Sequence, residues 1–243
     1  MALFPRSIRG RLVVWFVVIA LAPLAAVLFV SSVDTERAVE RNALSTIAAI
    51  AENKAARLDA YARERLRSVS SIASGLAFVG AAQDLGAAYR ADGSRDEAAH
   101  AAALAKYRGR LDDFARVAEF PTFLILDAGG RVVYAVGGDH LLHRRVDEPD
   151  LAGTGLAAAI AKVRTEKRAL VTPPQLARDG VRPQVQVMGP LVKDGAVVGF
   201  AAVALASDEI DAIVADYAGL GETGSVLCAA RVGGEVVVTT PTR

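Results

Sequence analysis

The sequence predicts an α+β domain in which helices pack on an antiparallel sheet. Five short runs rich in β-branched and aromatic residues are joined mostly by hairpin turns, and helical periodicity dominates the chain before the first of them. The 243 residues, 53% of them hydrophobic and 23% charged, are sufficient for a globular core of this kind.

The N-terminal segment predicts a transmembrane anchor. Residues 12–33 contain no charged side chain, and a helix rising about 1.5 Å per residue crosses a hydrocarbon core of about 30 Å over such a run. Arg6, Arg9 and Arg11 precede it and acidic residues follow it, so the positive-inside rule predicts that residues 1–11 lie in the cytoplasm and the rest outside. A cleaved signal peptide is the alternative, and the length of the run favours an uncleaved anchor.

A long helix is expected to continue from the anchor over residues 34–79. This segment lacks proline, and its first glycine is Gly75, while apolar residues recur at steps of three and four. Lys54 interrupts this apolar stripe. A helix of this length needs a partner, so we expect part of the stripe to dock on its own domain and part on a second copy in a homodimer.

The remaining elements follow in an order that defines one module at 80–218. We expect a helix at 96–117, strands at 121–126 and 131–136, a helix at 155–165, strands at 169–172, 184–192 and 196–206, and a short helix at 207–217.

Residues 219–224 (GLGETG) have the G-x-G-x-x-G spacing of a dinucleotide-binding loop. That loop requires a strand before it and a helix after it, whereas here a predicted helix precedes it and a strand-like run, SVLCAA, follows. We therefore interpret its glycines as turn residues at a module boundary, with residues 219–243 opening a second module.

No catalytic constellation is recognisable, and no catalytic residue, metal ion or cofactor is expected. The chain has no G-x-S-x-G motif, and the pair His140 and His143 beside Asp139 lacks a fourth metal ligand. Cys228 is the single cysteine, so it cannot form an intrachain disulfide. A net charge of +1 argues against a nucleic-acid partner.

Several segments together resemble the extracellular double Cache sensor of bacterial receptors, whose modules contain a PAS-like sheet. The segments are the anchor preceded by SIRGRL, the helix ALSTIAAIAENKAARLDAYARERLRSVSSIAS, the hairpin FLILDAGGRVVYAVGG, the pair VQVMGPLVKDGAVVGFAAVAL and the junction GLGETGSVLCAARVGGEVVV. The resemblance extends over nearly the whole chain.

The resemblance implies a dimeric receptor of the bacterial inner membrane with a periplasmic sensing module. Because the family places its sensor between two spans, the chain is expected to be the N-terminal part of a longer receptor. The implied output is a histidine kinase, with a chemotaxis or nucleotide cyclase domain as the alternative. A membrane-anchored binding protein without a signalling output is the competing interpretation.

In a Cache module the ligand lies against one sheet face, under the helix and loop between the second and third strands. Polar residues that interrupt those walls are therefore candidates for binding a small molecule: Tyr134, Arg144, Arg145, Gln184, Gln186 and Asp208. The two arginines can clamp a carboxylate, and the two glutamines share a strand face by the two-residue period; for each residue, simple exposure to solvent is the alternative. The sole tryptophan, Trp15, lies in the anchor, which argues against amino-acid sensing.

Overall fold

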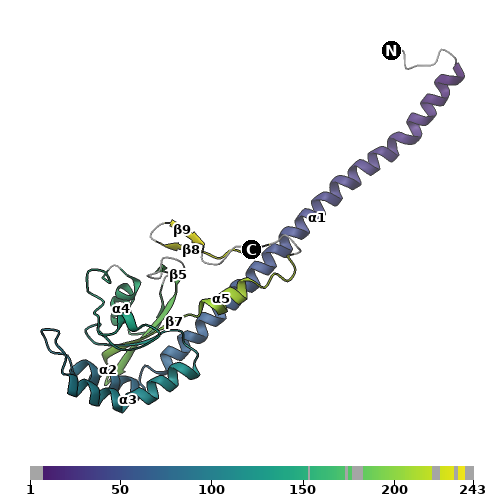
Figure 1. Ribbon diagram of the computed structural model, residues 1–243. Coiled ribbons are helices and arrows are strands. Elements are labelled where there is room, and N and C mark those ends of the chain that lie inside the picture. Colours follow the sequence, from purple (N-terminus) through teal and green to yellow (C-terminus); the bar gives the residue numbers. More distant parts are fainter. Residues whose placement is uncertain are drawn as a thin grey trace. The chain divides into compact units, whose positions relative to one another are not determined.

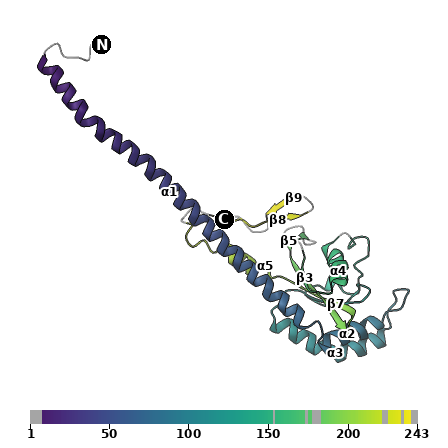
Figure 2. The same cartoon turned by 180° about the vertical axis from the view of Figure 1, so that it is seen from behind.

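The structure is a computed structural model that describes residues 8–152, 154–172, 175–176, 183–220, 225–232 and 235–238. The chain divides into two compact units, Met1–Asn53 and Lys54–Arg243. Helix α1 (Ile8–Ser71) supplies the first unit and begins the second (Figures 1 and 2).

The other elements all belong to the second unit. They are α2 (Leu76–Ala87), α3 (Glu97–Val117), β1 (Phe123–Asp127), β2 (Val132–Val136), the 3-10 helix η1 (Asp139–Leu141), α4 (Gly155–Glu166), β3 (Leu170–Val171), β4 (Gln175–Leu176), β5 (Pro183–Gln184), β6 (Gln186–Lys193), β7 (Ala196–Ala204), α5 (Ser207–Val214), β8 (Ala229–Val232) and β9 (Glu235–Val238).

The segment predicted as a membrane anchor, residues 12–33, lies within α1. Across the part of the chain that the structure describes, no helix combines the length and the apolar character that a membrane span requires. The apolar run belongs to one uninterrupted helix, which continues into a segment rich in arginine and glutamate.

The long helix ends earlier than the sequence predicts. Helix α1 stops at Ser71, and α2 begins at Leu76 after Gly75, which is its N-cap residue. The stripe continues across this break because Val69 near the end of α1 and Val79 in α2 are buried in the same core. Periodicity alone does not show the change of direction.

The central element is a five-stranded antiparallel sheet, which confirms the predicted fold class. Its order is β2-β1-β7-β6-β3, so β1 pairs with both β2 and the distant β7. The β6–β7 hairpin turns at Asp194 and Gly195, which both have positive φ, 50° and 77°; this is the turn that the sequence predicts.

Alternate strand residues face opposite sides of the sheet and form two cores. Phe123 and Ile125 of β1 pack with α2, α3 and the end of α1. Leu124 and Leu126 pack with α4 instead. Both views show α4 on the side of the sheet opposite α2 and α3 (Figures 1 and 2). The sheet thus separates a helical core from the α4 face.

The predicted module boundary is described only in part. Gly219 has a φ of 84°, a value that glycine adopts without strain, in agreement with a turn. The other glycines of the GLGETG motif, at 221 and 224, lie outside the described residues. Beyond them, β8 and β9 form a separate antiparallel pair. A second module at 219–243 stays a prediction.

Candidate functional site

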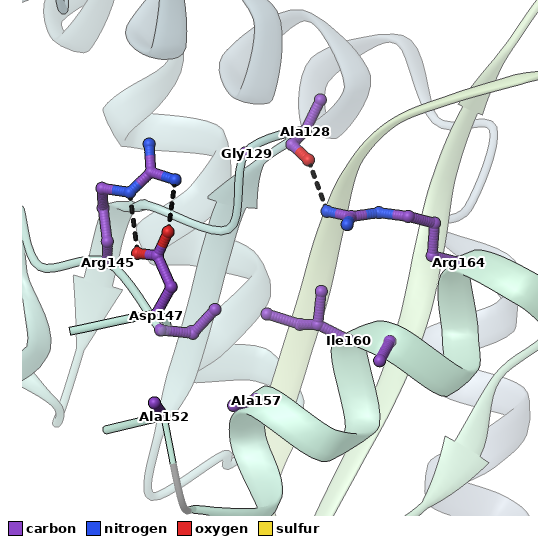
Figure 3. Close-up of a pocket in the computed structure, with 10 residues that line it drawn as sticks. Ala128, Gly129, Arg145, Asp147, Ala152, Ala157, Ile160 and Arg164 are labelled. Atoms are coloured by element: carbon purple, nitrogen blue, oxygen red, sulfur yellow. Dashed lines mark hydrogen bonds and ion pairs between the residues drawn. The ribbon is translucent and has the colours of Figure 1, made fainter. Parts of the chain in front are cut away.

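A cavity of about 480 Å³ lies on the α4 face, between α4, the β1–β2 turn and the loop after η1 (Figure 3). It is lined by Ala128, Gly129, Arg145, Val146, Asp147, Ala152, Ala157, Ile160, Ala161 and Arg164. The cavity therefore lies beside the helix and loop that connect the second and third strands of the five-stranded sheet.

Helix α4 supplies the apolar wall of the cavity. Residues 157, 160, 161 and 164 recur at steps of three and four, so they share one helix face. Ile160 on this face is buried against the sheet. Ala157 and Ala161 beside it are small, which leaves space that a larger side chain would fill.

Arg164 extends from the last turn of α4 towards the β1–β2 turn. One guanidinium nitrogen donates to the carbonyl oxygen of Ala128 at 2.8 Å (Figure 3), and the guanidinium carbon lies 5.5 Å from the ring centroid of Phe200. None of the ion pairs among the described residues includes Arg164. Its positive charge is therefore available to an anionic ligand.

Arg145 and Asp147 form an ion pair on the opposite wall. Arg145 donates from Nε and Nη2 to the two carboxylate oxygens of Asp147, at 2.8 and 2.7 Å (Figure 3). These hydrogen bonds raise the pKa of Arg145 and lower the pKa of Asp147, so both groups are charged at neutral pH. Because both side chains are partly exposed, the pair adds little to stability and mainly orients charge at the cavity.

The polar groups of the cavity are thus two guanidinium groups and one carboxylate above an apolar floor of Val146 and Ile160. A ligand carboxylate fits the donors of Arg164, since guanidinium carries only donors and matches carboxylate geometry. Asp147 can accept a hydrogen bond from a ligand amine or hydroxyl group. The lining residues include no nucleophile with an adjacent base, so the arrangement is suited to binding.

Of the six predicted site residues, Tyr134 lies in the helical core. Its hydroxyl donates to the Asp112 carboxylate, and its ring lies 6.2 Å from that of Phe123. Burial, together with Asp112, raises its pKa. The register shifts so that Ile125 pairs with Tyr134 and Leu126 with Val132. This bulge turns Tyr134 away from the α4 face.

The neighbouring Arg144 is held by acidic residues of its own loop. It donates to Glu148 at 2.9 and 2.6 Å and to Asp150 at 2.6 Å. The hydrogen bonds that it donates to Asp150 and Glu148 raise its pKa. Arg144 shapes the loop and does not line the cavity.

The remaining candidates lie elsewhere. Gln186 pairs with Ala204, the last residue of β7. The other end of β7 is nearer the cavity, because Gly199 there pairs with Asp127 at the end of β1. Its Oε1 is buried without a hydrogen-bond partner among the described residues. Asp208 is exposed in the first turn of α5. The side chain of Gln184 lies outside the described part of the chain. Among the five candidates whose side chains the structure describes, Arg145 alone lines the cavity.

Sequence reasoning missed Arg164 and Asp147. A cation in the last turn of a helix is favoured by the helix dipole, so Arg164 has an ordinary structural explanation in the sequence. The available signal is its spacing from Ala157 and Ala161, because this spacing places two small residues on the same helix face as the long side chain of Arg164. Asp147 lies in a loop rich in charged residues and offers no such signal.

The histidine pair considered as metal ligands does not form a metal site with the residues that the structure describes. No group of three or more histidine, cysteine or acidic side chains lies close enough together in these parts of the chain. His140 is exposed, whereas His143 contacts Tyr89 and Arg95.

Comparison with known proteins gives distant structural similarity only. No family model matches the chain, and no curated protein is significantly similar in sequence. The sensor domain of the V. cholerae histidine kinase DctB aligns with 67% of this chain and 57% of its own length, at 10% identity and a TM-score of 0.45. The E. coli DcuS sensor domain aligns with 65% of this chain and 97% of its own length, at 9% identity and a TM-score of 0.44.

A chemoreceptor domain gives a similar result. The ligand-binding domain of the P. aeruginosa PAO1 amino acid chemoreceptor PctC, in complex with GABA, aligns with 77% of this chain and 71% of its own length, at 18% identity and a TM-score of 0.46. The chain spans little more than half the length of the DctB domain. Similarity at this level assigns neither a ligand nor an output. These structural neighbours are Cache and PAS-like sensor domains of histidine kinases and chemoreceptors, the class that the sequence resembles.

Proposed function

We propose that the chain is the ligand-sensing module of a bacterial signal-transduction receptor and that its ligand binds in the cavity beneath α4. The observation that carries this proposal is the cavity of about 480 Å³ lined by Arg145, Asp147 and Arg164. Small-molecule sites commonly have volumes of about 300–1,000 Å³ and a few polar groups on an apolar lining. The cavity agrees with both criteria.

The proposed ligand class is a small carboxylate, with or without an amine. Arg164 offers a planar set of donors that can bind both oxygens of a carboxylate. The alanine residues of the lining favour a ligand with a short carbon skeleton. An amine on the ligand would meet Asp147, which already pairs with Arg145.

Ligand binding would act by a population shift. The hydrogen bond from Arg164 to Ala128 links α4 to the β1–β2 turn, so a ligand that contacts both elements stabilises the arrangement in which they lie close together. Only such a difference in affinity between two arrangements can shift their populations.

The wider receptor context in this proposal depends on the apolar run of residues 12–33 and on the resemblance to Cache sensors. It consists of attachment to the inner membrane through residues 12–33, a periplasmic location, a homodimer formed through α1 and a histidine kinase output. A chemotaxis or cyclase output is the alternative, and so is a binding protein without an output. The reading frame of the gene beyond residue 243 distinguishes these outputs.

A thermal-shift screen tests the binding site. We expect a small carboxylate to raise the melting temperature of the chain in a saturable manner, since a ligand that binds only the folded state stabilises it. Arg164→Ala should weaken the affinity about 10-fold to 100-fold, because a hydrogen bond to a charged group contributes about 1.5–3 kcal/mol.

Arg116→Ala is the matched control. Arg116 is an exposed arginine of α3 that pairs with Asp113, on the other side of the sheet. It should leave the affinity unchanged. An equal loss of affinity in both variants would show that the ligand does not bind in this cavity. Tight binding of a carboxylate that Arg164→Ala leaves unchanged would show the same.

A further inference from the structure

A compact polar cluster lies against the loop that forms one wall of the cavity. Its centre is His143, whose Nδ1 lies 2.5 Å from the Tyr89 hydroxyl oxygen and whose Nε2 lies 2.5 Å from a guanidinium nitrogen of Arg95. The ring of His100 is 5.5 Å from that of His143, centroid to centroid. The cluster therefore connects the loop after η1 to the α2–α3 connection and to α3.

These contacts fit only one protonation state of His143. The Arg95 nitrogen lies 2.5 Å from Nε2 and 3.3 Å from Nδ1. A guanidinium group has donors and no acceptor, so the ring nitrogen that bonds to it must accept. With Nε2, at the shorter distance, as the acceptor, the proton of the neutral imidazole lies on Nδ1, which faces the Tyr89 oxygen. A protonated imidazole carries hydrogen on both nitrogens, which leaves no lone pair for Arg95.

The charges around His143 also oppose its protonation. The titratable and charged groups that face the cluster are Tyr89 and Arg95 from the α2–α3 connection, Glu97 and His100 from α3, Arg131 from the β1–β2 turn, and Asp127 from β1. Burial and the nearby Arg95 lower the pKa of both His143 and His100. The Nε2 of His100 is buried without a hydrogen-bond partner among the described residues.

The same residue fixes the main chain next to the cavity. The amide of His143 donates to the carbonyl oxygen of Val132 at 2.8 Å, and its own carbonyl oxygen accepts from Arg131 at 2.9 Å. Its φ of 71° is uncommon for a residue with a side chain. The side-chain contacts of His143 therefore hold a conformation that the backbone alone disfavours, and the cavity residues Arg145, Val146 and Asp147 follow directly.

We propose that His143 is a proton-operated latch that fixes this wall of the cavity at neutral pH and releases it in acid, so that acidity regulates ligand binding. This proposal depends on the proposed function for its ligand, although the movement itself does not. In the step, a solvent proton binds the Nε2 lone pair and the hydrogen bond from Arg95 is lost. The imidazolium and the guanidinium then repel each other, and the loop moves away from the α2–α3 connection.

The direction in which pH changes the stability of the folded loop follows from the linkage between proton binding and folding. Because the pKa of His143 is lower in the folded chain than its usual value of 6.5, the unfolded chain binds more protons as the pH falls below that value. The latch thus stabilises the folded loop above about pH 6.5 and loses this contribution as the pH falls through the lowered value.

Hydrogen exchange of the peptide covering residues 139–148 tests the latch without any ligand, so failure of the latch and failure of the proposed function are distinguishable. After correction for the intrinsic effect of pH, we expect protection of this peptide to fall about tenfold between about pH 7.5 and about pH 5, because His143 binds a proton more readily in the open loop than in the closed one. Strand β1 (Phe123–Asp127) should keep its protection over the same range.

His143→Gln is the main variant, because a glutamine oxygen can still accept from Arg95 but does not titrate. It should show the same protection at both pH values, whereas His140→Gln, a change at an exposed histidine of the same loop, should behave as the wild type does. Arg95→Gln is a second variant, which removes the repelling cation and should shrink the fall. If protection of this peptide does not change with pH in the wild type, the proposal is wrong. It is also wrong if protection falls as much in His143→Gln or in Arg95→Gln as it does in the wild type.

Discussion

At the residue scale, the face on which a side chain lies decides its role. Tyr134 and Arg145 are both polar residues near the same loop, yet the bulge in β2 buries Tyr134 among aromatic rings, and Arg145 reaches the cavity. The sequence shows which residues are polar. It does not show the bulge, because an extra residue in a strand depends on the pairing of β2 with β1.

Tyr134→Phe separates the structural role from the predicted binding role. The buried hydroxyl donates to Asp112, and removing it leaves that carboxylate without this hydrogen bond. We expect the free energy of unfolding to fall by about 1–2 kcal/mol in urea denaturation. The affinity for the carboxylate found by thermal shift should not change. Weaker binding with unchanged stability would instead return Tyr134 to the ligand site.

At the element scale, most helices and strands could be predicted because their turns carry glycine or aspartate at defined positions. The β6–β7 hairpin and helix α4 lie within a few residues of the expected ranges. The break between α1 and α2 could not be predicted, because both helices contribute residues such as Val69 and Val79 to one core. The pairing of β1 with β7 also joins segments that no local pattern connects.

Lys54 shows why the apolar stripe of α1 is interrupted. Its ammonium group donates to the carbonyl oxygens of Ile213, Val214 and Asp216, at 2.8, 3.3 and 2.5 Å, where α5 ends. Cations are favoured at this end of a helix. Although the side chain is only 6% exposed, its charge is compensated by these carbonyl groups. The interruption is therefore the contact that holds α5 against α1.

Lys54→Met tests this contact, because methionine keeps the apolar stem and removes the three hydrogen bonds. We expect a loss of about 2–3 kcal/mol in the free energy of unfolding, and faster hydrogen exchange in residues 207–216 than in β7. Arg57→Met is the control, because the exposed pair of Arg57 with Asp216 should contribute less than about 1 kcal/mol. Equal effects of the two variants would mean that Lys54 does not hold α5.

At the scale of the whole molecule, the compact unit Lys54–Arg243 is built on one sheet with two differently used faces. The helical face is packed with aromatic and aliphatic side chains, with a smaller cavity of about 270 Å³ beside α2 and the β6–β7 turn. The α4 face carries the cavity and its charged residues. The fold class could be predicted from the order of the strands and the turns between them. The lining could not, because it depends on how α4 meets the β1–β2 turn, as in the contact of Arg164 with Ala128.

The most direct test of the central claim is a crystal structure of the chain with the carboxylate that most increases its melting temperature. We predict electron density for the compound between α4 and the β1–β2 turn, with its carboxylate in hydrogen-bond contact with Arg164. An empty cavity, with the compound bound on the α2–α3 side of the sheet or near Gln186, would contradict the account.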